Sequence, residues 1–484
     1  MRRLLQSATI NTWISIGVRM GGLALLLPLV LRYLDLQQVL IWQLQSSIMA
    51  MMLWIDFGLT PTFSRFIAVA RGGGSLQDLR QTGRQELSTR GYPAEAGSAL
   101  DLGTMIGTSG RIYLAMALVG TLIIGLIGTL VMMGPVAALS NPVEGWQAWA
   151  FTAVAVPFAL MNGNNASVLI GCDRITTLRR VESVIGLLQI LSTSVVVVVT
   201  ENLAWIAASY TFWTVAGFAL NRWQRQSVLR GQEGLAAKDI ARVWDQQVLR
   251  VTWAASWRSG VGVLFSTGII QGTGMIMPQI ASAEISAAYL LILRLMTVAS
   301  QMSQAPFYSR LPAMAKANAG GDRAEMVALA KHGLRLSLWT MVVGIFGILF
   351  VFPQLLLWIN VSVRMPPSSL SLLLALAFFA ERYGAMHMQI YTLSNHVIWH
   401  RVNGLTGVAI IVAFAVIWPM VGTAAMPMAM LGGYGLYLCP AISRRSLAFI
   451  GQDRWRFERD TSLGPGLGLA ACTALFFLLG WWQG

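Results

Sequence analysis

Long, uninterrupted runs of apolar residues dominate the pattern along this chain of 484 residues. Most of them have about the 20 residues that an α-helix needs to cross a hydrocarbon core of about 30 Å. Shorter segments with charged residues, glycine or proline separate the runs. The pattern therefore predicts an all-α polytopic membrane protein. The thirteen predicted spans cover residues 8–31, 38–61, 106–133, 148–170, 181–200, 203–221, 253–277, 284–306, 336–358, 370–394, 403–420, 422–440 and 464–482.

The composition agrees with an apolar environment for most side chains. Hydrophobic residues make up 56% of the chain and charged residues only 11%, which excludes a soluble globular protein. Cys172, Cys439 and Cys472 lack the spacing of a disulfide framework or a metal site. We expect these cysteines to pack inside the bundle.

Basic residues are distributed unevenly between the two sides of the predicted spans. The formal net charge is +14, and 27 of the 34 lysine and arginine residues fall in segments that are cytoplasmic if the N-terminus is cytoplasmic. Only Arg32 and Arg364 fall in segments on the opposite side. This asymmetry predicts a multi-pass protein with a cytoplasmic N-terminus, and it accounts for the charge without a nucleic-acid partner.

Two short patterns recur six spans apart. In Pro61–Phe66 and Pro306–Leu311, a serine follows the proline by three residues and an arginine by four. Thr252-Trp253 before Arg258 likewise repeats Thr12-Trp13 before Arg19. The recurrence predicts two six-helix lobes related by a pseudo-two-fold axis along the membrane normal, plus an extra C-terminal helix. The predicted domains are an N-terminal lobe (1–222), a cytoplasmic linker (223–252), a C-terminal lobe (253–441) and a basic cytoplasmic segment with the last helix (442–484).

Motifs for catalysis are missing from the sequence. It contains no nucleophile-elbow pattern, no phosphate-binding glycine-rich loop followed by lysine, and no zinc-ligand spacing. His396 and His400 are four residues apart, but they lie at a predicted helix end beside Arg401, where we do not expect a metal ion. The sequence therefore predicts neither an enzyme nor a cofactor, and it predicts no nucleotide-driven pump.

Ionisable residues within the predicted spans are the candidate functional residues. An arginine at the centre of a bilayer costs about 2.5 to 3.5 kcal/mol on insertion scales, so such residues face a cavity or a partner helix. A polar stripe on one helical face runs from Arg294 through Thr297 and Gln301 to Gln304. The candidates for binding an anion in a cavity are Arg19, Arg111, Arg258, Arg294 and Arg382, and those for coupling or gating are Asp56, Gln301 and Glu381.

Several of these candidates have a structural alternative. Arg111 and Arg258 lie near the predicted cytoplasmic ends of their helices, where an arginine can also fasten neighbouring helices together. Asp56 can equally cap or brace the lower end of the second span, and this is the interpretation that we favour. Glu381 points about 100° away from Arg382 on a helix, so the sequence does not fix whether the two pair.

The layout resembles the Wzx-type polysaccharide flippases of the multidrug/oligosaccharidyl-lipid/polysaccharide (MOP) exporter superfamily. The residues that carry the resemblance are the run Asp56-Phe57-Gly58-Leu59 with the proline and arginine after it, the turn Gly171-Cys172-Asp173-Arg174, and the charged first and seventh spans. The resemblance implies two lobes around a cavity with alternating access, in a bacterial cytoplasmic (inner) membrane. It implies that the substrate is an undecaprenyl-pyrophosphate-linked oligosaccharide. The partners that it implies are membrane lipids and, as candidates, a polysaccharide polymerase and ligase.

The net positive interior agrees with such a substrate, because guanidinium groups bind pyrophosphate oxygens in a bidentate manner. One alternative is a multidrug or organic-cation antiporter of the same fold, which requires acidic residues in the cavity. Another is a membrane glycosyltransferase or ligase, which requires a long outside loop with catalytic residues. The predicted outside loops are short, and the predicted interior has few acids.

Overall fold

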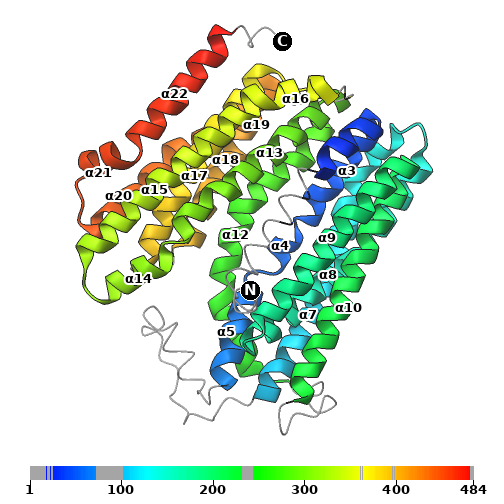
Figure 1. The fold of residues 1–484 in the computed structure, drawn as a ribbon, viewed down its shortest axis with the longest axis horizontal. Coiled ribbons are helices and arrows are strands. Elements are labelled where there is room, and N and C mark those ends of the chain that lie inside the picture. The colour runs from blue at the N-terminus through cyan, green and yellow to red at the C-terminus, as the bar shows by residue number, and fades with distance from the viewer. Residues whose placement is uncertain are drawn as a thin grey trace, which may run out of the picture. The chain divides into compact units, whose positions relative to one another are not determined.

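A computed structural model describes residues 18, 22, 25–71, 102–231, 244–359, 361, 364–394, 396 and 398–479. All regular secondary structure in these residues is helical (Figure 1). Nine helical stretches in the described part are long and apolar enough to cross a membrane, and a bent pair formed by α21 (Arg454–Thr461) and α22 (Leu463–Leu478) raises the number to ten. The predicted all-α polytopic class is therefore confirmed.

The difference between thirteen predicted spans and this number has three sources. Most of the predicted span 8–31 lies outside the described residues. The predicted span 38–61 is divided among short helices. The two predicted spans between 403 and 440 are counted as one helical stretch, Trp399–Ile450, because the 3-10 turn Gly422–Ala424 joins them without a loop, although the α-helices on the two sides of this turn pack against each other.

The chain divides into two compact units, Met1–Val263 and Leu264–Gly484. The boundary lies inside α12 (Gln246–Ile280), which contributes to both units. The predicted domain boundaries at 222, 252 and 441 stay predictions. The helices of the first unit are α3 (Leu36–Met49), α4 (Met52–Ile55), α5 (Leu59–Arg71), α7 (Leu102–Ala137), α8 (Pro142–Gly171), α9 (Ile175–Thr200), α10 (Leu203–Arg230) and the first part of α12.

Helices α7, α8, α9 and α10 of the first unit lie side by side (Figure 1). Leu118, Leu122 and Leu126 on α7 are exposed, as expected for a helix face that contacts lipid. The opposite face of α7 packs against α5 and α8 around Phe63 and Tyr113, which are both fully buried. The core of the unit therefore lies where α5, α7 and α8 meet.

The second unit contains the rest of α12, α13 (Ala283–Tyr308), α14 (Leu311–Ala319), α15 (Arg323–Phe346), the π-helical segment Gly347–Val351, α16 (Phe352–Ile359), α17 (Ser368–Thr392), α18 (Trp399–Val421), the 3-10 turn Gly422–Ala424, α19 (Ala425–Gly432), the π-helical segment Gly433–Leu438, α20 (Cys439–Ile450), α21 and α22. One core cluster joins Phe307 of α13, Met386 of α17 and Phe457 of α21. Helix α17 packs against α13, α15, α19 and α20, so its residues reach the interior of the unit.

The second predicted span is interrupted because two consecutive residues adopt a left-handed backbone conformation. Phe57 and Gly58 adopt φ angles of 48° and 70°, which separate α4 from α5. A left-handed conformation is unusual for a phenylalanine and costs conformational energy. The carboxylate of Asp56 compensates, because it accepts hydrogen bonds from the backbone N–H and the side-chain hydroxyl of Thr60 in the first turn of α5.

The two proline motifs share one local hydrogen bond. The hydroxyl of Ser64 donates to the carbonyl oxygen of Pro61 at 2.9 Å, and the hydroxyl of Ser309 donates to that of Pro306 at 3.1 Å. A serine three residues after a proline caps the same backbone group in both units. Other helical serines of this chain, such as Ser109, make the same bond to the carbonyl three residues earlier, so the register of the repeat stays a prediction.

Candidate functional site

The first unit holds a closed polar cluster at the break between α4 and α5. The Tyr113 hydroxyl, from α7, donates to the Asp56 carboxylate at 3.1 Å and lies 2.8 Å from the Thr60 hydroxyl. Ser167, from α8, donates to the carbonyl oxygens of Thr60 and Gly163 at 3.3 and 2.8 Å. Asp56 thus accepts bonds from Thr60 and Tyr113, which supports the interpretation that it braces this helix end.

Close packing leaves little free space in this cluster. Gly163 of α8 faces it, and a Cβ atom there would lie 2.8 Å from Cε1 of Tyr113 and 3.4 Å from Oδ1 of Asp56. Only glycine lets α8 approach so closely. The cluster is a satisfied structural network in the described conformation, and a coupling role for Asp56 stays a prediction.

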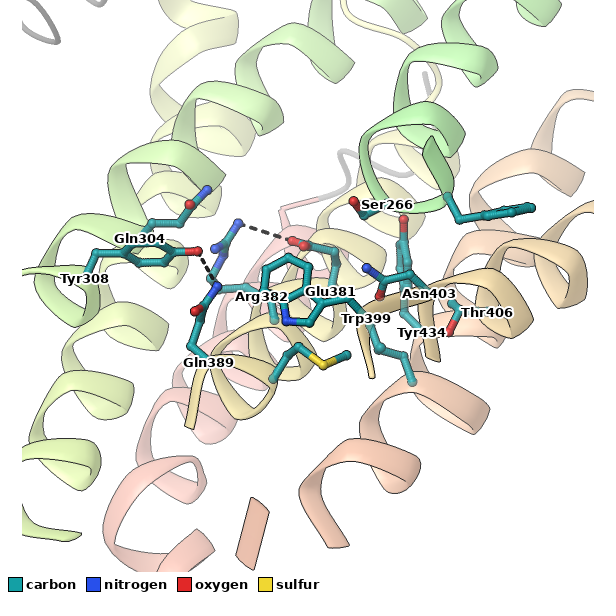
Figure 2. Close-up of a pocket in the computed structure, with 14 residues that line it drawn as sticks. Ser266, Gln304, Tyr308, Glu381, Arg382, Gln389, Trp399, Asn403, Thr406 and Tyr434 are labelled. Atoms are coloured by element: carbon teal, nitrogen blue, oxygen red, sulfur yellow. Dashed lines mark hydrogen bonds and ion pairs between the residues drawn. The ribbon is translucent and has the colours of Figure 1, made fainter. Parts of the chain in front are cut away.

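The second unit holds a cavity of about 120 Å³ whose lining mixes polar and apolar side chains (Figure 2). Helices α12, α13, α17 and α18 and the π-helical segment Gly433–Leu438 supply its lining. Uncharged polar and aromatic side chains predominate among the lining residues, and the charged ones are the neighbours Glu381 and Arg382. The polar and aromatic lining residues labelled in Figure 2 are Ser266, Gln304, Tyr308, Glu381, Arg382, Gln389, Trp399, Asn403, Thr406 and Tyr434.

Glu381 and Arg382 form an ion pair, although they are adjacent on α17. An Nη atom of Arg382 lies 3.2 Å from a carboxylate oxygen of Glu381 and also donates to the hydroxyl of Ser300 on α13. The Arg382 side chain is only 3% exposed. A guanidinium in such surroundings needs a counter-charge, and Glu381 supplies it. The structure thereby fixes a pairing that the sequence left open.

Two lining residues keep polar atoms without a partner. The hydroxyl of Tyr434 and the Nε atom of Arg382 are buried, and neither makes a hydrogen bond to another described residue. Gln389, in contrast, donates to the hydroxyl of Tyr308 at 2.7 Å. Some polar groups of the cavity are therefore hydrogen-bonded to each other, whereas others have no partner among the described protein atoms.

The remaining predicted site residues are spread over both units. Arg19 lies outside the described residues. Arg111 is exposed on α7, and Arg258 is half-buried on α12 with its guanidinium 5.7 Å from the ring centre of Trp257. On α13, Arg294 is half-buried and Gln301 is exposed. A cavity shared by Arg19, Arg258 and Arg294 therefore stays a prediction.

Sequence reasoning found part of this cavity and missed the rest. Gln304, the last member of the predicted polar stripe on α13, does line the cavity, as do Glu381 and Arg382. Trp399, Asn403 and Tyr434 were not singled out. Tyr434 lies in the π-helical segment Gly433–Leu438, and π-helical turns are frequent at functional positions, but nothing in the sequence alone indicates that turn.

Metal binding has no support in the described part of the chain. No group of three or more histidine, cysteine, aspartate or glutamate side chains there is arranged to hold an ion.

No protein-family model and no curated protein matches the sequence. The fold, in contrast, is similar to solved structures of MOP transporters. An inward-facing multidrug resistance MATE family transporter of the MOP superfamily matches with a TM-score of 0.64 and 10% identity, over 92% of this chain and 98% of that chain. The lipid II flippase MurJ, in an inward closed conformation, matches with a TM-score of 0.54 and 12% identity, over 97% of this chain and 98% of that chain.

A third similar structure is a MOP superfamily transporter from Pyrococcus furiosus that is distinguished by the reverse polarity of its binding pocket. It matches with a TM-score of 0.55 and 12% identity, over 93% of this chain and 97% of that chain. Identities this low establish the fold alone. The chain therefore has a MATE-like transporter fold, similar to those of these MOP-superfamily proteins, and its substrate has to be argued from its own residues.

Proposed function

We propose that this chain is a flippase that moves an undecaprenyl-pyrophosphate-linked oligosaccharide from the cytoplasmic to the periplasmic leaflet of a bacterial inner membrane by alternating access. It would serve the assembly of an extracellular polysaccharide or O-antigen, with the polymerase and ligase of that pathway as candidate partners. The similarity to both a multidrug transporter and a lipid II flippase is compatible with this function and with its main alternative.

The observation that carries the proposal is that both candidate carboxylates within the predicted spans have partners inside the protein. Asp56 accepts hydrogen bonds from Thr60 and Tyr113, and Glu381 is paired with Arg382. A transporter of organic cations needs a carboxylate that can receive the cation or a coupling proton. Both candidate acids in the described residues already have partners, which argues against a multidrug antiporter.

The predicted arginines favour an anionic substrate. Arg19, Arg258 and Arg294 are proposed to attract the pyrophosphate, because planar guanidinium groups bind phosphate oxygens bidentately and keep their charge in apolar surroundings. Arg111 and Arg382 belong to the same proposed set of cavity residues, Arg382 as one half of an ion pair. The polyprenyl tail can stay in the lipid while the head group crosses.

A transport assay tests the proposal directly. Full-length protein in liposomes should move a fluorescent undecaprenyl-pyrophosphate-linked oligosaccharide between leaflets, and an Arg294→Ala variant should lose about tenfold or more of that rate, since each charge-assisted hydrogen bond is worth about 1.5 to 3 kcal/mol. Arg294→Lys should recover part of the rate as a point charge without the bidentate fork. Arg364→Ala, an exposed arginine in the segment before α17, is the matched control.

A second arm of the assay addresses the alternative. The same liposomes, loaded with ethidium under a proton or sodium gradient, should show no gradient-driven flux of the dye. Gradient-driven ethidium transport together with no movement of the lipid-linked oligosaccharide would replace the flippase proposal by the multidrug antiporter.

A further inference from the structure

The cavity of the second unit is electrically neutral although it contains an arginine. Its two charged residues, Glu381 and Arg382, neutralise each other at 3.2 Å. Its other polar groups are amides, hydroxyls and an indole, which carry no net charge. A free phosphate would find no unopposed positive charge here, and an organic cation would find no unopposed carboxylate. The lining therefore suits a ligand that is polar and uncharged.

The unused hydrogen-bonding groups point to the same conclusion. The Tyr434 side chain is 3% exposed and lines the cavity, and its hydroxyl has no partner among the described residues. The Nε atom of Arg382 is likewise buried and has no hydrogen-bond partner among the described residues. A buried polar atom without a partner costs free energy unless a ligand or water completes its bonding. Both residues line the cavity, so a ligand rich in acceptor oxygens can complete their bonding.

The rest of the lining offers the kinds of groups that a sugar ring needs. In the view of Figure 2, Gln304 lies on one side of the cavity, Asn403 and Tyr434 lie on the other, and Trp399 lies between them. Each amide offers a donor and an acceptor, as sugar hydroxyls require. The indole of Trp399 offers an apolar face and an N–H group. This combination of aromatic surface and a few convergent polar groups is typical of small-molecule sites.

Size limits the ligand to a small group. A cavity of about 120 Å³ has room for several water molecules, since one needs about 10–15 Å³ on the same scale. That space is of the order of one sugar ring, so the cavity contacts one ring of a larger head group at a time. We infer that the cavity of the second unit binds one uncharged sugar of the translocated head group, through Gln304, Trp399, Asn403 and Tyr434. The inference rests on the proposed flippase function and assigns to these residues the recognition of the sugar.

A single-atom change tests the inference without disturbing the fold. Tyr434→Phe removes only the hydroxyl that has no partner, so the unliganded protein loses no internal hydrogen bond. Tyr289→Phe is the matched control, because Tyr289 on α13 is also fully buried but does not line the cavity. The probes are undecaprenyl pyrophosphate without a sugar, and the same lipid carrying one hexose or one N-acetylhexosamine. Dissociation constants for the purified full-length protein would come from native mass spectrometry titrations.

We expect the wild-type protein to bind at least one glycosylated probe more tightly than the bare lipid. Tyr434→Phe should weaken the binding of that probe by about three- to tenfold and leave the binding of the bare lipid unchanged. Tyr289→Phe should match the wild type on every probe. If Tyr434→Phe weakens the bare lipid equally, or if it changes neither glycosylated probe, the sugar site is refuted.

The wild-type protein distinguishes failure of this inference from failure of the proposed function. Equal binding of bare and glycosylated lipids would remove the sugar site and leave a flippase that recognises the pyrophosphate. Binding of none of the three lipids would overturn the proposed function, and the sugar site with it.

Discussion

The break between α4 and α5 in the first unit and the cavity in the second unit are both polar sites at membrane depth, but they are completed in different ways. Around Asp56, protein atoms supply the partners, and Gly163 lets α8 approach until little space remains. Around Arg382, one carboxylate balances the charge, and the Tyr434 hydroxyl keeps an unused bonding capacity beside about 120 Å³ of space. The polar groups of the first site are satisfied by protein atoms, whereas the second site keeps unused bonding groups beside free space.

The register of the repeat sharpens this contrast. When Pro61 is aligned with Pro306, Asp56 corresponds to Gln301, which is exposed on α13. The first unit therefore uses a carboxylate to close a helix break at a position where the second unit has an amide and a continuous helix. The aligned positions therefore differ in both backbone and chemistry, and substitutions in each unit should differ in size and sign.

The largest effect is expected from breaking the ion pair in the second unit. Glu381→Ala leaves the buried guanidinium of Arg382 without a counter-charge, and loss of one partner of a buried pair costs about 3–5 kcal/mol of stability. The double variant Glu381→Ala/Arg382→Leu should cost less than this single change, because it removes the stranded charge. Unfolding of the purified protein by heat and by denaturant measures both.

The control for this experiment is an ion pair at the surface of the same unit. Lys331 and Asp460 lie 2.8 Å apart, but their side chains are 26% and 40% exposed. Asp460→Ala should change the melting temperature little, because solvent screens such pairs. A double variant at Glu381 and Arg382 that is less stable than Glu381→Ala alone would show that the arginine is held by other contacts than the pair.

The next effect is expected at Asp56 in the first unit. Asp56→Ala removes the acceptor for Thr60 and Tyr113 and should cost about 1.5–3 kcal/mol, the range for hydrogen bonds to a charged group. Asp56→Asn keeps one acceptor oxygen and should cost less. Measuring unfolding and flipping rates together separates bracing from coupling. If Asp56→Asn abolishes transport at unchanged stability, the carboxylate acts in coupling and the contrast between the two sites fails.

The sequence predicted the spanning helices well, because hydrophobic runs respond directly to the thickness of the bilayer. It also placed Glu381 and Arg382 among the candidates and Gln304 on a polar stripe, since polar atoms in apolar helices require an explanation, whereas the candidate Gln301 is exposed and does not line the cavity. It did not predict the break at Phe57, because a left-handed phenylalanine depends on the Asp56–Thr60 bonds around it. It also missed Trp399, Asn403 and Tyr434, because ordinary aromatic and amide residues become a site only through tertiary packing and a π-helical turn.

A substitution that disturbs the packing around Asp56 should have a smaller effect on stability. Gly163→Ala would place a Cβ atom 2.8 Å from Tyr113 and should cost about 1–3 kcal/mol as overpacking. Gly125→Ala is the matched control on α7, because a Cβ atom there meets open space. The control should stabilise the helix by about 0.5–1 kcal/mol. Equal melting temperatures for the two variants would mean that the cluster around Asp56 has room to adjust, contrary to a closed site.

The smallest effect is the most direct comparison, because the same oxygen atom is removed in each unit. Tyr113→Phe deletes a hydroxyl that donates to Asp56 at 3.1 Å and lies 2.8 Å from that of Thr60, so it should cost about 1 kcal/mol. Tyr434→Phe deletes a buried hydroxyl without a partner and should be neutral or stabilise the unliganded protein by up to about 1 kcal/mol. Thermal unfolding in one detergent compares them.

Opposite signs are expected because the desolvation of the hydroxyl is already compensated by hydrogen bonds at Tyr113 and is uncompensated at Tyr434. A loss of similar size in both variants would show that Tyr434 has a partner in the unliganded protein, and the cavity would then lose its strongest mark of a binding site.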